Sequence, residues 1–218
     1  MSEDFAFEPR NGLPGLLPRG ERILWQGRPN WLALARGPLL GDWVAIYFGA
    51  LVAWRVADGM AAGAPGSMVL AHSVALGLMG AICLVLIGLI GWAMARTTTY
   101  TITNRRVVLK IGVALRKCVN VPFKRVAAAT LRATGGGRGD IILTVGGKDR
   151  FAWLMLWPHV RPWRLGRPEP MLRGLPDAAA AASVLGRALA LYQAENGVDA
   201  PIPAGPPPHP DAVLTPAE

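Results

Sequence analysis

The side chains best suited to recognition lie close together between residues 157 and 173 of this 218-residue chain. Arginine forks bind carboxylates and phosphates in bidentate fashion, and tryptophan and arginine are enriched at the energetic centres of binding surfaces. This segment therefore predicts a surface that binds a partner or membrane headgroups. The alternative is that the tryptophans plug the open end of a sheet domain while the arginines are solvated. The segment contains Trp157, His159, Arg161, Trp163, Arg164, Arg167 and Arg173.

A second pair of cationic side chains, Arg105 and Arg106, follows a β-branched segment that begins soon after the longest apolar stretch. The preceding Asn104 and the alternation of Val107 with Leu109 predict a hairpin tip at this point. Because the tip is close in sequence to a predicted membrane span, we expect these two arginines to contact lipid headgroups rather than to form a specific site.

Catalytic chemistry is not supported by the remaining polar residues. The glycine-rich segment 135–140 lacks the Gly-Lys-Ser/Thr ending of a phosphate loop and precedes a predicted strand, so a hairpin turn is favoured. His72, His159 and His209 are far apart, and the 14 acidic residues are scattered. No metal site, nucleophile with its base, or pair of converging carboxylates can be assembled. The sequence predicts a protein that is not an enzyme, with no metal and no cofactor.

The charge distribution favours a negatively charged neighbour. The chain has a net charge of +9, and 17 of its 23 basic residues lie between Arg96 and Arg187. Anionic lipids or an acidic partner surface would match this charge. Nucleic acid is disfavoured, because the signature of an RNA-binding sheet is absent. Cys83 and Cys118 are too few and too differently placed for a disulfide framework or a zinc site.

These side chains must be positioned by elements of two kinds, of which the first is a pair of apolar segments. Residues 68–95 carry no charge and exceed the ~20 apolar residues that a helix needs to cross a bilayer. Residues 37–56 form a weaker candidate, for which a helix in the interface or against a soluble core is the alternative. With residues 57–67 as a loop, the two segments predict a transmembrane helical hairpin.

Orientation follows from the basic residues that flank these spans. Arginines and lysines are dense before the first span and after the second, whereas the loop has only Arg55 at its edge. The positive-inside rule therefore places both termini in the cytoplasm and loop 57–67 in the periplasm. Glycines in the second span, Gly77, Gly80, Gly88 and Gly91, offer a surface for close helix packing, on which the expectation of a homodimer rests.

The second kind of element is a set of short strands in residues 97–195. We expect a cytoplasmic antiparallel β-sandwich or barrel there, joined by a strand from the N-terminal segment 1–30. Residues 151–156 are expected to form a strand and residues 157–176 to be irregular. Asp177 as N-cap and Gly197 as terminator predict a C-terminal amphipathic helix that closes the domain. Residues 196–218 are rich in proline and predict a disordered tail.

This arrangement resembles the pleckstrin-homology (PH) domains of membrane-anchored bacterial proteins, and more specifically the PuhB family of photosynthetic complex assembly proteins of purple bacteria. The first resemblance rests on Tyr100-x-Ile102-Thr103-Asn104-x-Arg106, Gly112, Pro122-Phe123-Lys124-Arg125-Val126 and Gly137-x-Gly139-Asp140-Ile141. The second rests on Phe5-Ala6-Phe7-Glu8-Pro9, Gly12-Leu13-Pro14, Ile23-Leu24-Trp25-Gln26-Gly27-Arg28-Pro29 and Leu156-Trp157-Pro158-His159-x-Arg161-Pro162-Trp163-Arg164-Leu165.

The resemblance implies a helper in building the photosynthetic reaction centre and its light-harvesting 1 ring, located in the bacterial inner (intracytoplasmic photosynthetic) membrane. Its expected partners are reaction-centre and light-harvesting 1 subunits, together with anionic membrane lipids. The alternative is a general membrane-anchored PH-like module that binds lipid or protein and has no connection with photosynthesis.

His72 lies about one turn inside the outer end of the second span. An imidazole in a membrane helix is costly unless it has a partner, and a neutral histidine can ligate the magnesium of bacteriochlorophyll. Because this position can also meet interfacial water, hydrogen bonding to water or to a neighbouring helix is the favoured interpretation, and transient pigment contact the alternative.

Overall fold

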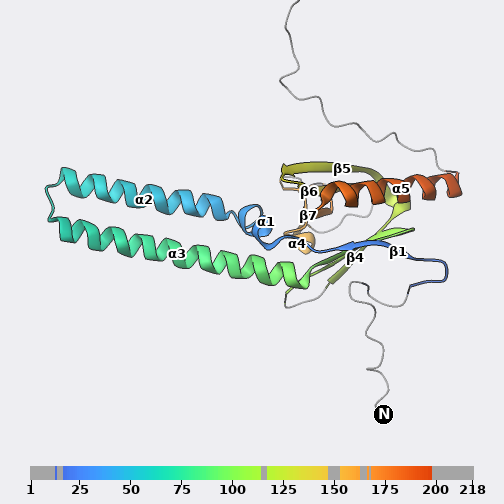
Figure 1. Cartoon of the computed structure of the whole chain (residues 1–218), viewed down its shortest axis with the longest axis horizontal. Coiled ribbons are helices and arrows are strands. Elements are labelled where there is room, and N and C mark those ends of the chain that lie inside the picture. The colour runs from blue at the N-terminus through green and yellow to red at the C-terminus, as the bar shows by residue number, and fades with distance from the viewer. Residues whose placement is uncertain are drawn as a thin grey trace, which may run out of the picture.

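A pair of long helices projects from a domain built of two antiparallel sheets and one covering helix (Figure 1). The computed structural model describes residues 13, 17–113, 117–146, 153–162, 166 and 168–197. The expected tail after residue 197 and most of the N-terminal segment before residue 17 lie outside these residues.

The projecting pair consists of α2 (Gly41–Ala61) and α3 (Gly66–Thr97). Both are long and apolar enough to cross a membrane. Helix α2 begins later than the expected residue 37, because Gly37–Leu40 turn the chain after the short helix α1 (Trp31–Arg36). It also continues to Ala61, through residues that were expected in the loop. Within this last part of α2, Gly59 packs closely on α3: a Cβ at Gly59 would lie 2.6 Å from Cγ2 of Val69. The connection between the two helices is therefore shorter than predicted.

The first sheet has four strands in the order β1 (Ile23–Gly27), β2 (Thr99–Thr103), β3 (Arg106–Ile111) and β4 (Lys117–Pro122). All neighbours are antiparallel. The prediction that an N-terminal strand joins the sheet is confirmed. Strand β1 pairs with β2, although the whole helical hairpin lies between them in the sequence. The last strand, β4, ends at Pro122, which has no N–H to donate, in agreement with its predicted place at a sheet edge.

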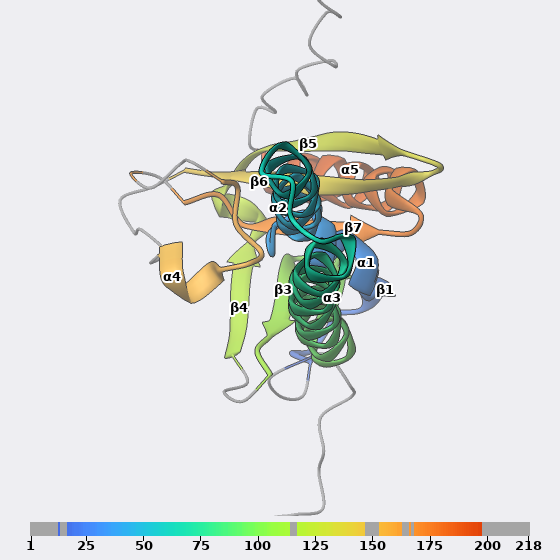
Figure 2. The ribbon, with the colours of Figure 1, turned by 90° about the vertical axis from the view of Figure 1, so that its left-hand side faces the viewer.

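The second sheet contains β5 (Val126–Gly135), β6 (Arg138–Val145) and β7 (Met171–Leu175). Helix α5 (Ala178–Asn196) covers it, with the Asp177 carboxylate accepting from the Ala180 amide and Gly197 in a left-handed conformation after its end, as predicted. The core between the layers is apolar. Its members include Tyr100, Ile102, Leu109, Leu143, Leu172 and Leu185. Figure 2 looks along the hairpin and shows β5, β6 and α5 on the side of α2.

Three expectations for the domain need correction. In the part of the chain that the structure describes, the strands form two separate sheets and do not close into a barrel. The 3-10 turn η1 (Phe123–Arg125) carries the chain from the first sheet to the second. Trp153–Leu156 form a short helix, α4, instead of part of a strand. The segment expected to be irregular contains strand β7, which pairs with β6.

Candidate functional site

The candidate functional region of this fold is the junction where the helical hairpin meets the sheets. Helix α1 lies there, with contacts to both α3 and β7. Asn30 starts it: its side-chain oxygen accepts from the amides of Leu32 (2.9 Å) and Ala33 (3.4 Å). Its own backbone amide donates to the carbonyl of Gly174 in β7 (2.8 Å). One residue thus caps the helix and ties it to the second sheet.

Two glycines allow α1 to approach its neighbours closely. A Cβ at Gly91 of α3 would lie 3.0 Å from the carbonyl oxygen of Trp31, and one at Gly174 would lie 2.9 Å from the Cβ of Ala33. Gly174 also has a φ of +64°, a conformation that side chains disfavour. Because α1 is clamped between α3 and β7, the hairpin is fixed in orientation relative to the sheets.

A buried polar cluster lies beside this clamp. His159 has its Nδ1 2.7 Å from the hydroxyl oxygen of Tyr100 and its Nε2 3.3 Å from the Oγ1 of Thr98, the residue that caps α3. The amide of Arg173 donates to the Tyr100 hydroxyl oxygen (3.2 Å). The Tyr100 hydroxyl also donates to the carbonyl of Arg173 (3.5 Å), so this side chain joins His159 to the backbone of β7.

Burial fixes the protonation of this cluster. Desolvation, reinforced by the positive charge of Arg173, lowers the pKa of His159 from 6.5 to about 3. Desolvation also raises the pKa of Tyr100 above its ordinary value of 10. Both side chains are therefore neutral at physiological pH, and both are closed to solvent. The cluster joins the end of α3 to β7 and is not arranged for proton transfer to a substrate.

Arg173 is the one charged member of the cluster, and it is 8% exposed. Its Nη2 donates to the carbonyl of Val160 (3.1 Å). Desolvation lowers its pKa, whereas the negative charge of the buried Asp140 raises it. Asp140 in turn accepts from the Gly174 amide (2.7 Å), so the same carboxylate offsets the arginine charge and fixes the glycine that contacts α1.

The tryptophan, histidine and arginine segment does not form one exposed surface in the described residues. Trp157 is 38% exposed, whereas His159 is 1% exposed and cannot reach a partner at the surface. Arg161 is partly buried, and its guanidinium pairs with Glu169 at 3.0 Å. Trp163 and Arg164 lie outside the described residues, as does Arg167. A partner-binding role for Trp157 and Arg161 stays a prediction.

The other predicted contact residues occupy separate places. Arg106 forms a bidentate pair with the buried carboxylate of Glu21 (2.8 and 3.1 Å), so its fork is occupied within the domain. Arg105 is exposed at the β2–β3 tip. His72 lies on an exposed face of α3, with Nδ1 2.8 Å from the carbonyl oxygen of Met68. This bond is local to the helix, and pigment contact stays a prediction.

Sequence reasoning missed the clamp and the buried cluster. The sequence does contain a helix-start signal at Asn30, but α1 is too short for a periodic pattern to identify it. Tyr100 and His159 are 59 residues apart, and no local pattern predicts that pairing. Among the described residues, no three His, Cys, Asp or Glu side chains gather where they could hold a metal ion.

The arrangement of a helical hairpin followed by an antiparallel sheet domain matches a known family. The profile described as "Bacterial PH domain" matches residues 37–189, which is more than half of the chain. The chain belongs to this bacterial PH domain family. The matched region contains both apolar helices as well as the sheets, so the hairpin is part of the family unit. Strand β1 and helix α1 precede it in sequence yet complete the first sheet and the junction.

A relative of this bacterial PH domain protein occurs in Rhodobacter capsulatus, under the name "Uncharacterized 23.7 kDa protein in puhA 5'region". It is 37% identical over 191 residues, which cover 85% of this chain and 87% of the relative. The similarity therefore spans nearly the whole of both proteins. No solved structure matches the chain.

Proposed function

We propose that this bacterial PH domain protein is a non-enzymatic assembly factor for the photosynthetic reaction centre–light-harvesting 1 complex, anchored in the bacterial inner membrane by α2 and α3. Two observations support the photosynthetic part: the relative's name places it in the puhA 5' region, and the sequence resembles the PuhB family.

The observation that carries the proposal is the exposed apolar surface of the hairpin. Only 6% of the most apolar window of α2 and 11% of that of α3 are buried within the molecule. A core helix of a soluble protein would be mostly buried. Large side chains point outward all along both helices, among them Trp43, Ile46, Trp54, Leu78, Ile82, Val85 and Leu89. Lipid, or the membrane helices of other subunits, would cover such a surface.

The charge distribution supports a cytoplasmic sheet domain. The basic residues that follow α3 favour the cytoplasmic side under the positive-inside rule, and the short connection between α2 and α3 then faces the periplasm. In this orientation the hairpin would meet the membrane helices of immature reaction-centre and light-harvesting 1 subunits. The sheet domain would meet their cytoplasmic faces, with Trp157 as an exposed aromatic contact.

The second candidate function is a general membrane-anchored module that binds lipid or protein without a photosynthetic role. The family match favours it, because the matched description names a domain and no photosynthetic process.

Affinity purification distinguishes the two functions. The tagged full-length protein is isolated from mildly solubilised membranes of its photosynthetic host, the co-eluting proteins are identified, and the absorption spectrum is recorded. We expect reaction-centre and light-harvesting 1 subunits in the eluate. A far-red absorption band would additionally support pigment contact at His72. An eluate without photosynthetic subunits would contradict the proposal and favour the general module.

A matched pair of variants tests the cytoplasmic contact. Trp157→Ala removes an exposed aromatic side chain, and Leu191→Ala removes an exposed aliphatic side chain on α5. We expect a lower recovery of co-eluting subunits from Trp157→Ala alone, at equal protein level. Equal recovery from both variants would contradict a contact at Trp157.

A further inference from the structure

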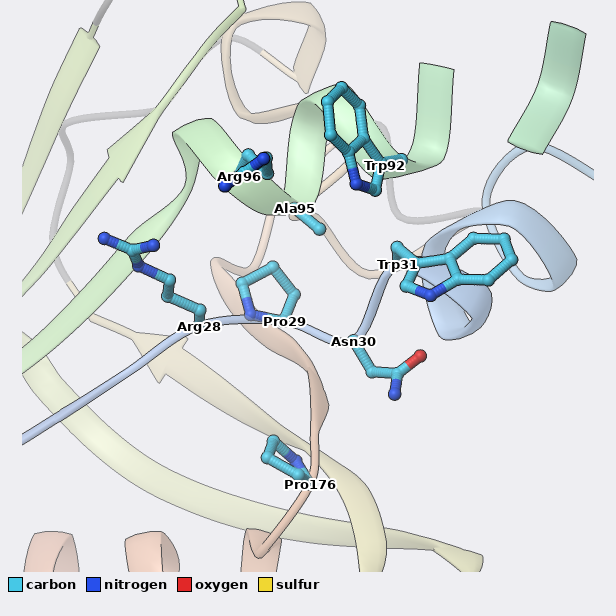
Figure 3. A pocket seen from close by; sticks show the side chains of 8 residues that line it. All are labelled: Arg28, Pro29, Asn30, Trp31, Trp92, Ala95, Arg96 and Pro176. Atoms are coloured by element: carbon cyan, nitrogen blue, oxygen red, sulfur yellow. The ribbon is translucent and has the colours of Figure 1, made fainter. Parts of the chain in front are cut away.

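A cleft opens at the junction, between the last turns of α3 and the segment that enters α1. Its volume is about 380 Å³, which is within the range of small-molecule sites, about 300–1,000 Å³. Two arginines and two tryptophans provide its functional groups (Figure 3): Arg28 and Arg96, Trp31 and Trp92. The prolines Pro29 and Pro176 and the residues Asn30 and Ala95 complete its lining. In Figure 3 the guanidinium groups lie on one side of the opening and the indole rings on the other.

The cleft is positively charged and has no internal counterion among the described residues. Arg28 and Arg96 are both exposed, and neither forms an ion pair with a described carboxylate. Arg36, at the other end of α1, differs, because Asp42 neutralises it at 2.9 Å. The junction thus leaves two guanidinium groups available for an external anion. Their fork geometry suits phosphate.

Arg96 is not required to complete its own helix. The Thr97 hydroxyl donates to the carbonyls of Ala93 (3.0 Å) and Met94 (3.2 Å), and the Thr98 amide also donates to Met94 (3.0 Å). The carbonyls of Ala93 and Met94 in the last turn of α3 therefore have donors other than Arg96. The Arg96 guanidinium lies 5.1 Å from the ring centroid of Trp92, one turn earlier, and this cation–π contact holds it at the mouth of the cleft.

The tryptophans indicate the depth of the cleft relative to a bilayer. Trp31 is 45% exposed and Trp92 is 48% exposed, and tryptophan is enriched at the level of lipid headgroups. Arg96 follows Trp92 by one turn, which places it about 6 Å further along the helix axis, towards the sheet domain. The aromatic side of the cleft therefore faces the interface, and the cationic side lies where headgroup phosphates would be.

Residues of the clamp also line the cleft, since Asn30 and Trp31 belong to both. Pro29 restricts the backbone next to Arg28, and Asn30 is hydrogen bonded to Gly174 of β7. On the opposite wall, Gly91 leaves no space between α3 and α1. The two arginines are held on neighbouring elements that cannot easily separate. Such preorganisation lowers the entropic cost of binding a ligand.

We propose that this cleft binds the phosphate headgroup of an anionic phospholipid from the cytoplasmic leaflet. The inference rests on the proposed membrane insertion of α2 and α3, but not on the photosynthetic role. Arg28 and Arg96 hold the phosphate, while Trp31 and Trp92 contact the glycerol and upper acyl region. The bound lipid fixes the height of the sheet domain above the membrane.

Native mass spectrometry of the full-length protein tests the site. The protein, in neutral detergent, is supplied with equal amounts of phosphatidylglycerol and phosphatidylcholine, and the retained lipid is counted. Wild type is expected to retain phosphatidylglycerol preferentially. A basic residue near an anionic membrane surface contributes about 1 kcal/mol, a factor of about five, so Arg28→Ala/Arg96→Ala should retain it roughly 30-fold less.

The matched control is Lys124→Ala/Arg187→Ala, which removes two exposed cations from η1 and α5, outside the cleft. It should retain phosphatidylglycerol as wild type does. An equal loss in both double variants would show a non-specific charge effect and overturn the site, and so would wild type without lipid preference. Complete displacement of the lipid by inorganic phosphate would overturn the lipid assignment in favour of a soluble phosphate.

The experiments distinguish failure of the headgroup site from failure of the proposed assembly role. Protein that is recovered outside the membrane fraction would contradict membrane insertion, on which both proposals depend. Membrane-inserted protein that lacks lipid preference but co-purifies with photosynthetic subunits would overturn the headgroup site alone. Lipid preference without co-purifying subunits would overturn the assembly role alone.

Discussion

The helical hairpin and the sheet domain use the same apolar residue types in opposite ways. In the sheet domain, Ile102 and Leu109 are completely buried. In α3, Ile82 and Leu86 are 60% and 53% exposed. The sheet domain therefore buries its own apolar side chains, whereas the hairpin leaves most of its apolar surface exposed. Composition alone cannot show this difference; it depends on what each side chain contacts.

The glycines of the junction differ from some of those in the hairpin, although Gly59 and Gly80 lie at close contacts between α2 and α3. Gly174 and Gly91 are at close contacts that hold the junction together, whereas Gly49 and Gly77 of the hairpin have no neighbouring atom within 4 Å of an added Cβ. The junction is thus closely packed, and these hairpin positions are open for contact with lipid or another helix.

The largest expected effect comes from a charge placed on the hairpin. Ile82→Arg should cost about 3–4 kcal/mol of membrane insertion, because isoleucine favours and arginine opposes the centre of a spanning helix. Leu191→Arg, at an equally exposed position of α5, should change stability by less than about 0.5 kcal/mol. The measurement is the urea-resistant membrane fraction of each variant. Similar fractions for both would show that the two surfaces face the same solvent.

A matched pair of leucine truncations compares the two interiors. Leu109→Ala should lower the free energy of unfolding of the sheet domain by about 2–5 kcal/mol, through lost burial and the cavity left behind. Leu86→Ala should cost less than about 1 kcal/mol, because this side chain does not fill a core. Thermal unfolding of the purified full-length protein measures both. A large loss from Leu86→Ala would mean that α3 is buried in the protein itself.

The buried histidine should make the stability of the sheet domain depend on pH. Because the pKa of His159 is lowered from 6.5 to about 3 in the folded state, the unfolded chain binds more protons between these values. The contribution of His159 to the free energy of unfolding is therefore fully present above pH 6.5. It is lost as the pH falls below this value, by at most about 1.4 kcal/mol per pH unit. Unfolding measurements from pH 7 to pH 4.5 test this slope. His159→Gln should be less stable at pH 7 and have a shallower slope; an unchanged slope would exclude His159 as its origin.

A matched pair of glycine substitutions separates packing from backbone strain at the junction. Gly174 and Gly63 both have a φ of +64°, but only Gly174 has a neighbour that an added Cβ would meet, Ala33 at 2.9 Å. Gly174→Ala and Gly63→Ala share a backbone cost of about 1–2 kcal/mol. Overpacking should add about 1–3 kcal/mol to Gly174→Ala alone. Equal shifts in unfolding temperature would show that α1 is not clamped against β7.

Much of the fold was predictable because its signals are local. The apolar run before Arg96 identified α3, the pair Asp177 and Gly197 bounded α5, and the unpartnered strand near Trp25 required a sheet to join. Strand β7 escaped prediction because Arg173 and Gly174 interrupt its apolar character. Both residues serve the junction: the arginine in the buried cluster, and the glycine in contact with α1.

The candidate site was predictable only in part, because its contacts join distant residues. A surface rich in tryptophan and arginine was expected, yet His159 proved to be buried and Arg106 to be paired with Glu21. The cleft combines Arg28 with Arg96, which the sequence separates by the entire hairpin. Only the packing of α1 between α3 and β7 brings these residues together.

The most direct test of the account is the accessibility of single cysteines on the two sides of the hairpin. In a variant with Cys83→Ser and Cys118→Ser, Ala62→Cys marks the connection between α2 and α3, and Ala190→Cys marks an exposed site on α5. Spheroplasts are treated with a membrane-impermeant thiol reagent before and after lysis. If the hairpin spans the membrane with the sheet domain in the cytoplasm, Ala62→Cys is labelled before lysis and Ala190→Cys only after it. Labelling of both before lysis, or of Ala190→Cys alone, would contradict a hairpin that spans the membrane and holds the sheet domain on its cytoplasmic side.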